Sequence, residues 1–211
     1  MEQLRHLVLL VLVSLMTGCA FGQKISYTGV SNFEIPEKIP ATVGLAVSDK
    51  RPAVVSGDHS LQWVGYSRPP LAIPYGVHTA TGRPLSDDLA SLLQSTLATR
   101  HVVAQTVSTQ PFEDRQVIVD RLGSFRNPRS VLVTLHDWKT DSYVGLSVSL
   151  HYSVTLEVVN AKGEYLGRAS SVGVRDLSSS YPLSLAVTQI FQELFNAPEV
   201  KKALENGKAK G

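Results

Sequence analysis

The stretch GLSVSLHYSVTLEVV, residues 145–159, decides the fold. Its even positions are all apolar or aromatic, whereas the odd positions from Ser147 to Glu157 are polar. Side chains alternate between the two faces of a β-strand, so a period of two over this length predicts a long antiparallel strand. One face of the resulting sheet should be buried and the other should contact water.

The segments around this strand extend the sheet. Residues 160–163, Asn-Ala-Lys-Gly, provide a turn, and residues 164–174 return as the partner strand. The run SVLVTLHDWKTDSY at 130–143 predicts a strand before the hairpin, and HVVAQTV at 101–107 predicts another. Near the start of the domain, Val43, Leu45 and Val47 alternate within residues 42–52 and indicate a first strand.

Three segments have helical periodicity. Residues 85–100 place five leucines on one face, residues 112–125 predict a shorter helix, and residues 181–206 form a broad apolar face that Pro198 interrupts. Strands and helices in this order predict an α+β fold. We expect a single domain at 41–206, with a mixed, mostly antiparallel sheet and helices packed on one face.

The segment between the first strand and the first helix, residues 53–84, is long for a loop and is rich in glycine and proline. It also carries Trp63, Tyr66, Arg68 and Tyr75. Aromatic residues and arginine are enriched where proteins bind one another, so these four are candidate partner-binding residues. The alternative is that they fold back onto the core. Residues 61–64 and 71–77 are each able to form a short strand.

Asp49-Lys50-Arg51 closes the first predicted strand. Ligands often bind at strand ends in α/β proteins, so we also treat Asp49 and Arg51 as candidate binding residues. The alternative is a solvated turn with a surface ion pair, which contributes about 0–1 kcal/mol.

The amino-terminal stretch LVLLVLVSLMTGCAFG, residues 7–22, predicts an export signal. Arg5 and His6 precede an apolar run that ends at Met16, about half of the roughly 20 residues that cross a bilayer. Residues 15–19, Leu-Met-Thr-Gly-Cys, resemble the bacterial lipobox. That resemblance implies removal of residues 1–18 as a signal peptide and acylation of Cys19, including a fatty acid such as palmitate on its amino group.

An acylated Cys19 would anchor the protein, since two or more chains hold a membrane firmly. We expect residues 19–40 to be a lipidated tether. Sorting rules of enteric bacteria associate an aspartate after the cysteine with the inner membrane. Ala20 at that position implies the outer membrane, with the domain facing the periplasm. An ordinary cleaved signal with a free cysteine, or an uncleaved membrane helix, are the alternatives.

The sequence contains little that predicts catalysis. Phosphate-binding loops of the GxxxxGK[ST] or GxGxxG type are missing, and Cys19 is the only cysteine. Neighbouring strands would bring His136 near His151, but no third ligand is spaced for a metal. We therefore predict no cofactor, no metal and no enzyme. An enzyme would need Asp49, His136, Asp137 and His151 to share one cleft. A net charge of +2 without a basic, aromatic stripe argues against nucleic acid.

The lipobox, the VGLAVSDKRP strand (43–52), the leucine-rich helix and the long hairpin together resemble YajG-type envelope lipoproteins. The pattern is similar, more loosely, to periplasmic lipoproteins with a TolB-amino-terminal-like domain. The resemblance implies a membrane-anchored envelope role without catalytic residues. We predict a non-catalytic accessory module that binds another envelope protein or a glycan. The alternative is a transport-accessory lipoprotein that binds a lipid or a small apolar ligand. The sequence leaves the oligomeric state open.

Overall fold

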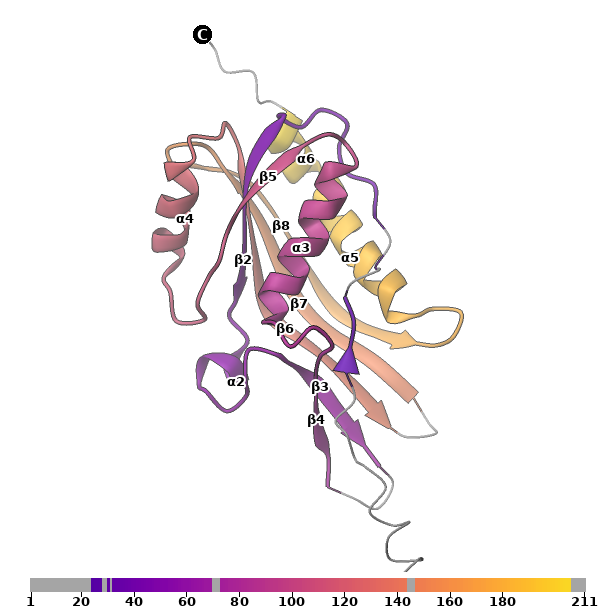
Figure 1. The fold of residues 1–211 in the computed structure, drawn as a ribbon. Coiled ribbons are helices and arrows are strands. Elements are labelled where there is room, and N and C mark those ends of the chain that lie inside the picture. The colour runs from indigo at the N-terminus through magenta and orange to yellow at the C-terminus, as the bar shows by residue number, and fades with distance from the viewer. Residues whose placement is uncertain (1–23, 28–29, 31, 70–72, 144–146, 206–211) are drawn as a thin grey trace, which may run out of the picture.

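The computed structural model describes residues 24–27, 30, 32–69, 73–143 and 147–205 (Figure 1). These residues form one mixed α/β domain with an eight-stranded sheet and five helices. The strands are β1 (Lys24–Ile25), β2 (Thr42–Asp49), β3 (Trp63–Arg68), β4 (Tyr75–Thr79), β5 (Val103–Val107), β6 (Ser130–Tyr143), β7 (Ser147–Val159) and β8 (Tyr165–Leu177). The helices are α2 (Pro52–Val55), α3 (Leu85–Ala98), α4 (Arg115–Ser124), α5 (Leu183–Asn196) and α6 (Pro198–Glu205).

Strand β6 organises the sheet. One edge of β6 pairs with β2 over its first half and with β3 over its last four residues, while the other edge pairs with β7 along nearly its whole length. The strand order is β1-β4-β3-β6-β2-β5, and β7 and β8 extend the sheet from the other edge of β6. The predicted hairpin is therefore confirmed as β7 and β8, and it is continuous with the strand expected at 130–143.

The sheet is mixed, and the expectation that it is mostly antiparallel is not confirmed. Four of the seven strand pairings are parallel and three are antiparallel. The parallel pairings of β2 with β5 and β6 follow from α3 and α4, because each helix carries the chain back before the next strand starts. The hairpins β3–β4, β6–β7 and β7–β8 supply the antiparallel pairings.

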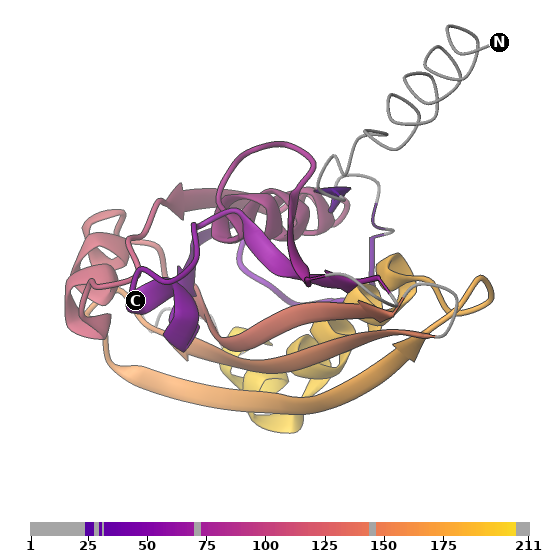
Figure 2. The same cartoon turned by 90° about the horizontal axis from the view of Figure 1, so that it is seen from below.

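Helices cover both faces of the sheet, which corrects the prediction of one covered face. The larger core lies on the face packed by α3, α5 and α6 and includes Leu45, Val133 and Leu156. A smaller core lies on the opposite face, where Ile118, Val119 and Leu122 of α4 cover one end of the sheet. Figure 2 shows β6, β7 and β8 curving around α5. At the end of the sheet that α4 covers, the side chains on both faces are buried in a core. At the other end, only the face toward α5 is buried.

The amino-terminal segment from residue 24 packs on the domain, so the expected boundary between tether and domain at residue 41 lies too late in the chain. Tyr27, Phe33 and Ile35 are buried. The Phe33 ring centroid lies 6.0 Å from that of Phe191 and 5.7 Å from that of Phe195. These contacts make the segment part of the main core.

Tyr27 ties this segment to the centre of the sheet. Nε1 of Trp138, in the middle of β6, donates a hydrogen bond of 2.9 Å to the Tyr27 hydroxyl. Burial disfavours the charged phenolate and raises the pKa of Tyr27 well above its ordinary value.

Residues 53–84, expected to be largely a loop, contain the short helix α2 and the β3–β4 hairpin. Gly65 in β3 allows this hairpin to approach β6. It has a φ of +150°, and a side chain there would overlap the backbone and hydroxyl of Thr140. Only glycine fits such a position, so Gly65 brings the aromatic residues of β3 against the sheet.

Candidate functional site

Asp49 and Arg51 lie inside the protein, which corrects both interpretations of them. Arg51 is 1% exposed and Asp49 3% exposed. Nε and Nη2 of Arg51 donate to the two carboxylate oxygens of Asp49 at 2.8 and 2.7 Å, and Nη1 donates to the carbonyl oxygens of Trp63 and Trp138 at 2.7 and 2.9 Å. The pair joins β2, β3 and β6 and is satisfied within the fold, so it offers no group to a partner.

Trp63 is also buried, beneath two other rings. The His59 ring stacks on Trp63 with centroids 4.1 Å apart, and the Tyr66 ring meets Trp63 edge-on at 5.2 Å. His59 Nε2 and the Tyr66 hydroxyl lie 2.6 Å apart, within hydrogen-bond distance. Trp63 therefore supports the positions of His59 and Tyr66, which are both partly exposed, and Tyr66 is the one that also contacts Arg68.

Arg68 extends the aromatic group toward the surface. Its Nε donates a hydrogen bond of 2.6 Å to Asp141 of β6. Its guanidinium lies over two rings, 5.3 Å from the Tyr66 centroid and 5.6 Å from the Tyr143 centroid. The hydrogen bond to Asp141 raises the pKa of Arg68, so the side chain stays charged. Two rings and a carboxylate thus hold one cation in a fixed position at the surface.

The Arg68 cluster, defined as Tyr66, Arg68, Asp141 and Tyr143, borders a sheet face that α4 leaves uncovered. We call this the open face; its other members come from β7 and β8. They are Ser149, His151, Ser153, Ser170, Val172, Val174 and Asp176. Val172 is 73% exposed, Val174 58% and Tyr143 44%. The polar face that the alternation in β7 predicts is confirmed, and exposed valines and a tyrosine lie among its polar groups.

Tyr75 does not join the Arg68 cluster. It lies opposite Ser67 in the β3–β4 hairpin, whereas Tyr66 lies opposite Gly76. Because consecutive residues of a strand point to opposite faces, Tyr75 and Tyr66 lie on opposite faces of the sheet. The structure therefore brings together Tyr66 and Arg68, supported by Trp63, and separates Tyr75, Asp49 and Arg51 from them.

The two strand histidines are not neighbours. A register irregularity between Leu135 and Asp137 sets His136 outside the ladder, and its Nε2 lies 3.3 Å from the Thr155 hydroxyl. His151 instead lies opposite Lys139 in the ladder. In the described part of the chain, no three histidine, cysteine or acidic residues are grouped as metal ligands. Of the four residues that an enzyme would need in one cleft, Asp49 is buried in its ion pair with Arg51.

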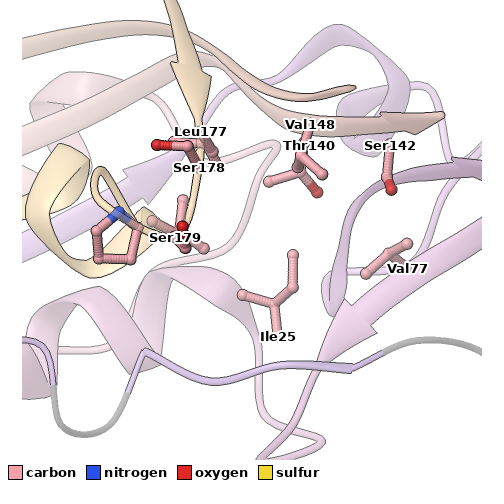
Figure 3. A pocket seen from close by; sticks show the side chains of 10 residues that line it. Ile25, Val77, Thr140, Ser142, Val148, Leu177, Ser178 and Ser179 are labelled. Atoms are coloured by element: carbon pink, nitrogen blue, oxygen red, sulfur yellow. The ribbon is translucent and has the colours of Figure 1, made fainter. Parts of the chain in front are cut away.

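A pocket of about 440 Å³ opens where the carboxyl-terminal end of β6 faces the start of α5 (Figure 3). Its wall is largely apolar, with Ile25 of β1 and Val77 of β4 opposite Val148 of β7 and Leu177 of β8. Thr140, Ser142, Ser178, Ser179, Pro182 and Leu183 complete the lining. Its volume lies within the range of small-molecule sites, roughly 300–1,000 Å³.

Sequence reasoning missed most of this pocket. Ile25 lay in the expected tether, and Leu177 follows the residues expected to form the return strand.

Two members of the Arg68 cluster, Asp141 and Tyr143, were expected only as parts of a strand. The sequence does not show that Asp141 and Tyr143 lie beside Arg68, because only the pairing of β3 with β6 brings these residues together.

The expected lipidation site, Cys19, and the rest of the signal lie outside the described residues. Among the helices that are described, none is long and apolar enough to cross a bilayer.

No protein-family model matches the sequence, and no curated protein matches it. Solved structures are similar in fold. A DUF330 protein from Xanthomonas campestris is 10% identical, with a TM-score of 0.50, over 86% of this chain and 95% of that one. PelC from Paraburkholderia phytofirmans, crystallised as a dodecamer, is 13% identical over 85% and 96%, with a TM-score of 0.41. Lipoprotein GNA1162 from Neisseria meningitidis is 18% identical over 75% and 100%, with a TM-score of 0.35.

The likeness to the DUF330 protein shows a shared fold. At these identities it does not carry residue roles from one protein to the other. The resemblance to YajG-type lipoproteins and to TolB-like domains stays a prediction.

Proposed function

We propose that this chain is a membrane-anchored envelope lipoprotein, and that its domain is a non-catalytic accessory module binding another envelope protein or a glycan through the open face. The observation that carries the proposal is the Arg68 cluster. A fixed arginine between two tyrosines at the edge of an uncovered sheet is an arrangement suited to recognition. Outer-membrane location with the domain in the periplasm belongs to the same proposal.

The Arg68 cluster suits binding better than it suits stability. Ion pairs near the surface contribute little to folding, and Tyr143 is too exposed to be a core residue. Binding costs side-chain entropy unless the side chains are already ordered. Arg68 is held by Asp141 and two rings in the free protein, so little of this cost remains to be met on binding.

The lipid anchor is tested first, because it determines where the domain acts. Intact mass of the full-length protein from bacterial membranes should correspond to a chain that begins at Cys19 and carries acyl groups. The Cys19→Ser variant should lose this mass and leave the membrane fraction. A wild-type protein with an unmodified cysteine and the same cellular fractionation as the variant would contradict the anchor.

The open face is tested by its protection in the envelope. A cysteine at Ser149 should react with a maleimide in purified protein but slowly in intact envelopes, where the partner covers it. The matched position is Ser95, exposed on α3 on the other side of the sheet. Cysteine at Ser95 should react alike in both preparations. Equal labelling of Ser149→Cys in both preparations would contradict a covered open face.

The pocket supports a second candidate function, the binding of a lipid acyl chain. It is apolar on most sides and has the volume of a ligand site. Its position also fits the anchor. Ile25 lies six residues after Cys19, and six extended residues span at most about 20 Å, so an anchored chain holds the pocket close to the bilayer.

Substitution at the pocket wall separates this candidate from the first. Leu183→Trp should fill the pocket and lower the amount of lipid that copurifies with the full-length protein, measured by native mass spectrometry after the protein is released from the detergent micelle. Leu185→Trp is the control, because Leu185 lies two residues further along α5, is exposed and is not part of the lining. Lipid retention that is equal in wild type and Leu183→Trp would eliminate the pocket as a lipid site, without affecting the open face.

A further inference from the structure

Strand β8 forms a long free edge of the sheet. It has 13 residues and, within the described chain, pairs only with β7. Figure 2 shows it as the outer rim of the curved sheet. Natural proteins usually protect such an edge with lysine, proline, a bulge or a covering element, because its unpaired backbone groups bind other strands. Residues 165–177 contain neither lysine nor proline, and the one register shift in the pairing with β7 lies at the start of the strand, between Tyr165 and Gly167.

The outward side chains of β8 form a symmetric pattern. On the open face they run Arg168, Ser170, Val172, Val174 and Asp176, and all five are exposed. A cation and an anion lie four residues on either side of Val172. Val172 is 73% exposed and Val174 58%, so two apolar side chains face water next to a free strand edge, as a contact surface would have.

We propose that β8 pairs with β8 of a second copy of this chain, antiparallel, about a two-fold axis that passes through Val172. In this register Arg168 of each copy lies opposite Asp176 of the other, and Ser170 lies opposite Val174. A two-fold contact requires a surface that is complementary to itself, and the sequence of β8 meets this requirement. The two sheets would join into one, with both open faces on the same side.

The charges select this register. Side chains directly opposite each other share a face, so the axis has to pass through a residue rather than between two. An axis through Ser170 would set Arg168 opposite Val172, and an axis through Val174 would set Asp176 opposite Val172. An axis through Ser171 would set Arg168 opposite Val174, and an axis through Gly173 would set Asp176 opposite Ser170. Only the axis at Val172 pairs both charges.

Both charged groups are available for this contact. Arg168 makes one long hydrogen bond, 3.4 Å from Nη2 to the Thr155 hydroxyl, and is exposed. Asp176 is exposed on the same face, opposite Ser149 in the ladder. On the other face, Gly167 lies directly against α6, where a side chain would overlap the carbonyl oxygen of Glu199, so the open face is the one that carries the exposed side chains of β8.

Single cysteines test the register in native membranes, with the full-length protein and its Cys19 retained. The two copies of Val172→Cys would face each other across the axis, at a separation that a disulfide spans, and mild oxidation should yield a covalent dimer. Val174→Cys is the matched control, because its two copies would be four residues out of register. The wild-type protein is a second control, because any covalent dimer that it forms would have to arise through Cys19. Equal crosslinking of the two variants, or none for Val172→Cys, would overturn the proposal.

Charge exchange tests the same contact by reversible association. Arg168→Asp should weaken the dimer of the detergent-extracted protein about tenfold or more, since two acidic pairs would then face each other. Adding Asp176→Arg should restore the dimer, because the pairs are exchanged rather than lost. A wild type that remains monomeric at every concentration, or a dimer that Arg168→Asp does not weaken, would overturn the proposal. So would a double variant that folds, by circular dichroism, but stays as weak as the single variant.

Discussion

The guanidinium of Arg51 and the carboxylate of Asp49 form a two-point ion pair in the interior, and the same guanidinium binds the carbonyl oxygens of Trp63 and Trp138. Arg51→Met would leave a buried carboxylate without its countercharge and would remove the guanidinium donor from two carbonyl oxygens. We predict a loss of about 3–5 kcal/mol in the free energy of unfolding, the usual cost of breaking a buried pair. Urea unfolding followed by tryptophan fluorescence measures it, since the chain has only two tryptophans and both contact Arg51.

The double variant Asp49→Leu/Arg51→Met is the control for the charge. It should be less destabilised than the sum of its single variants, because neither charge is left unpaired. Additive losses would show that the two side chains act independently of each other.

Gly65 allows β3 to lie against β6, so its substitution should be costly. Gly65→Ala places a methyl group on Thr140, and we predict a loss of about 3 kcal/mol or more, measured by urea unfolding. Gly82→Ala is the matched control. Gly82 also has a positive φ, +71°, but a side chain there meets open space, so its cost should be about 1–2 kcal/mol. Similar losses for both variants would contradict the close approach of the two strands.

Phe33 tests whether the segment before β2 belongs to the domain. It packs on Phe191 and Phe195, so Phe33→Ala should cost about 3–5 kcal/mol of stability. Glu37→Ala, four residues later at an exposed position, should change stability by no more than about 0.5 kcal/mol. A Phe33→Ala variant as stable as wild type would restore the interpretation of residues 24–40 as a tether.

Tyr27 should make the domain sensitive to alkali. Its pKa is raised by burial in the folded state, whereas in the unfolded chain a tyrosine titrates near about 10. Above that pH the unfolded chain loses a proton that the folded chain keeps. The contribution of Tyr27 to the free energy of unfolding is therefore complete below about pH 10. Above that pH it falls by up to about 1.4 kcal/mol per pH unit.

The Tyr27→Phe variant isolates this effect. At neutral pH its free energy of unfolding should be about 1 kcal/mol lower, because the hydrogen bond from Trp138 is lost. Between pH 9 and 11, however, its stability should fall less than that of wild type. Parallel curves for the two proteins over that range would contradict the assignment to Tyr27.

Much of the fold is predictable from local patterns. The alternation in β7 identifies the hairpin, and the leucines of α3 and the apolar face of α5 identify two helices of 14 residues each. Each of these segments has a period that only one kind of secondary structure satisfies. Residues 24–40 have no such period. Tyr27, Phe33 and Ile35 are buried by tertiary packing of an irregular chain, and composition alone suggested a tether.

The candidate site was predictable only in part. Tyr66 and Arg68 were identified by residue type, but their partners Asp141 and Tyr143 are more than 70 residues away and become neighbours through strand pairing. The burial of Arg51 depends likewise on a carbonyl oxygen of β6. Residue type indicated which side chains suit binding, and only the tertiary structure distinguished the partly exposed Arg68 from the enclosed Arg51.

Photo-crosslinking from Ser149 in living cells tests the central claim, that the open face binds an envelope partner, most directly. A photoreactive residue at Ser149 of the full-length protein should give a discrete adduct whose mass differs from that of a dimer of this chain. The same probe at Ser95 on α3 should give no such adduct, and Arg68→Glu should remove the adduct from Ser149 while the protein stays folded. Adducts from Ser95 but not from Ser149, or a Ser149 adduct that Arg68→Glu leaves unchanged, would contradict the claim.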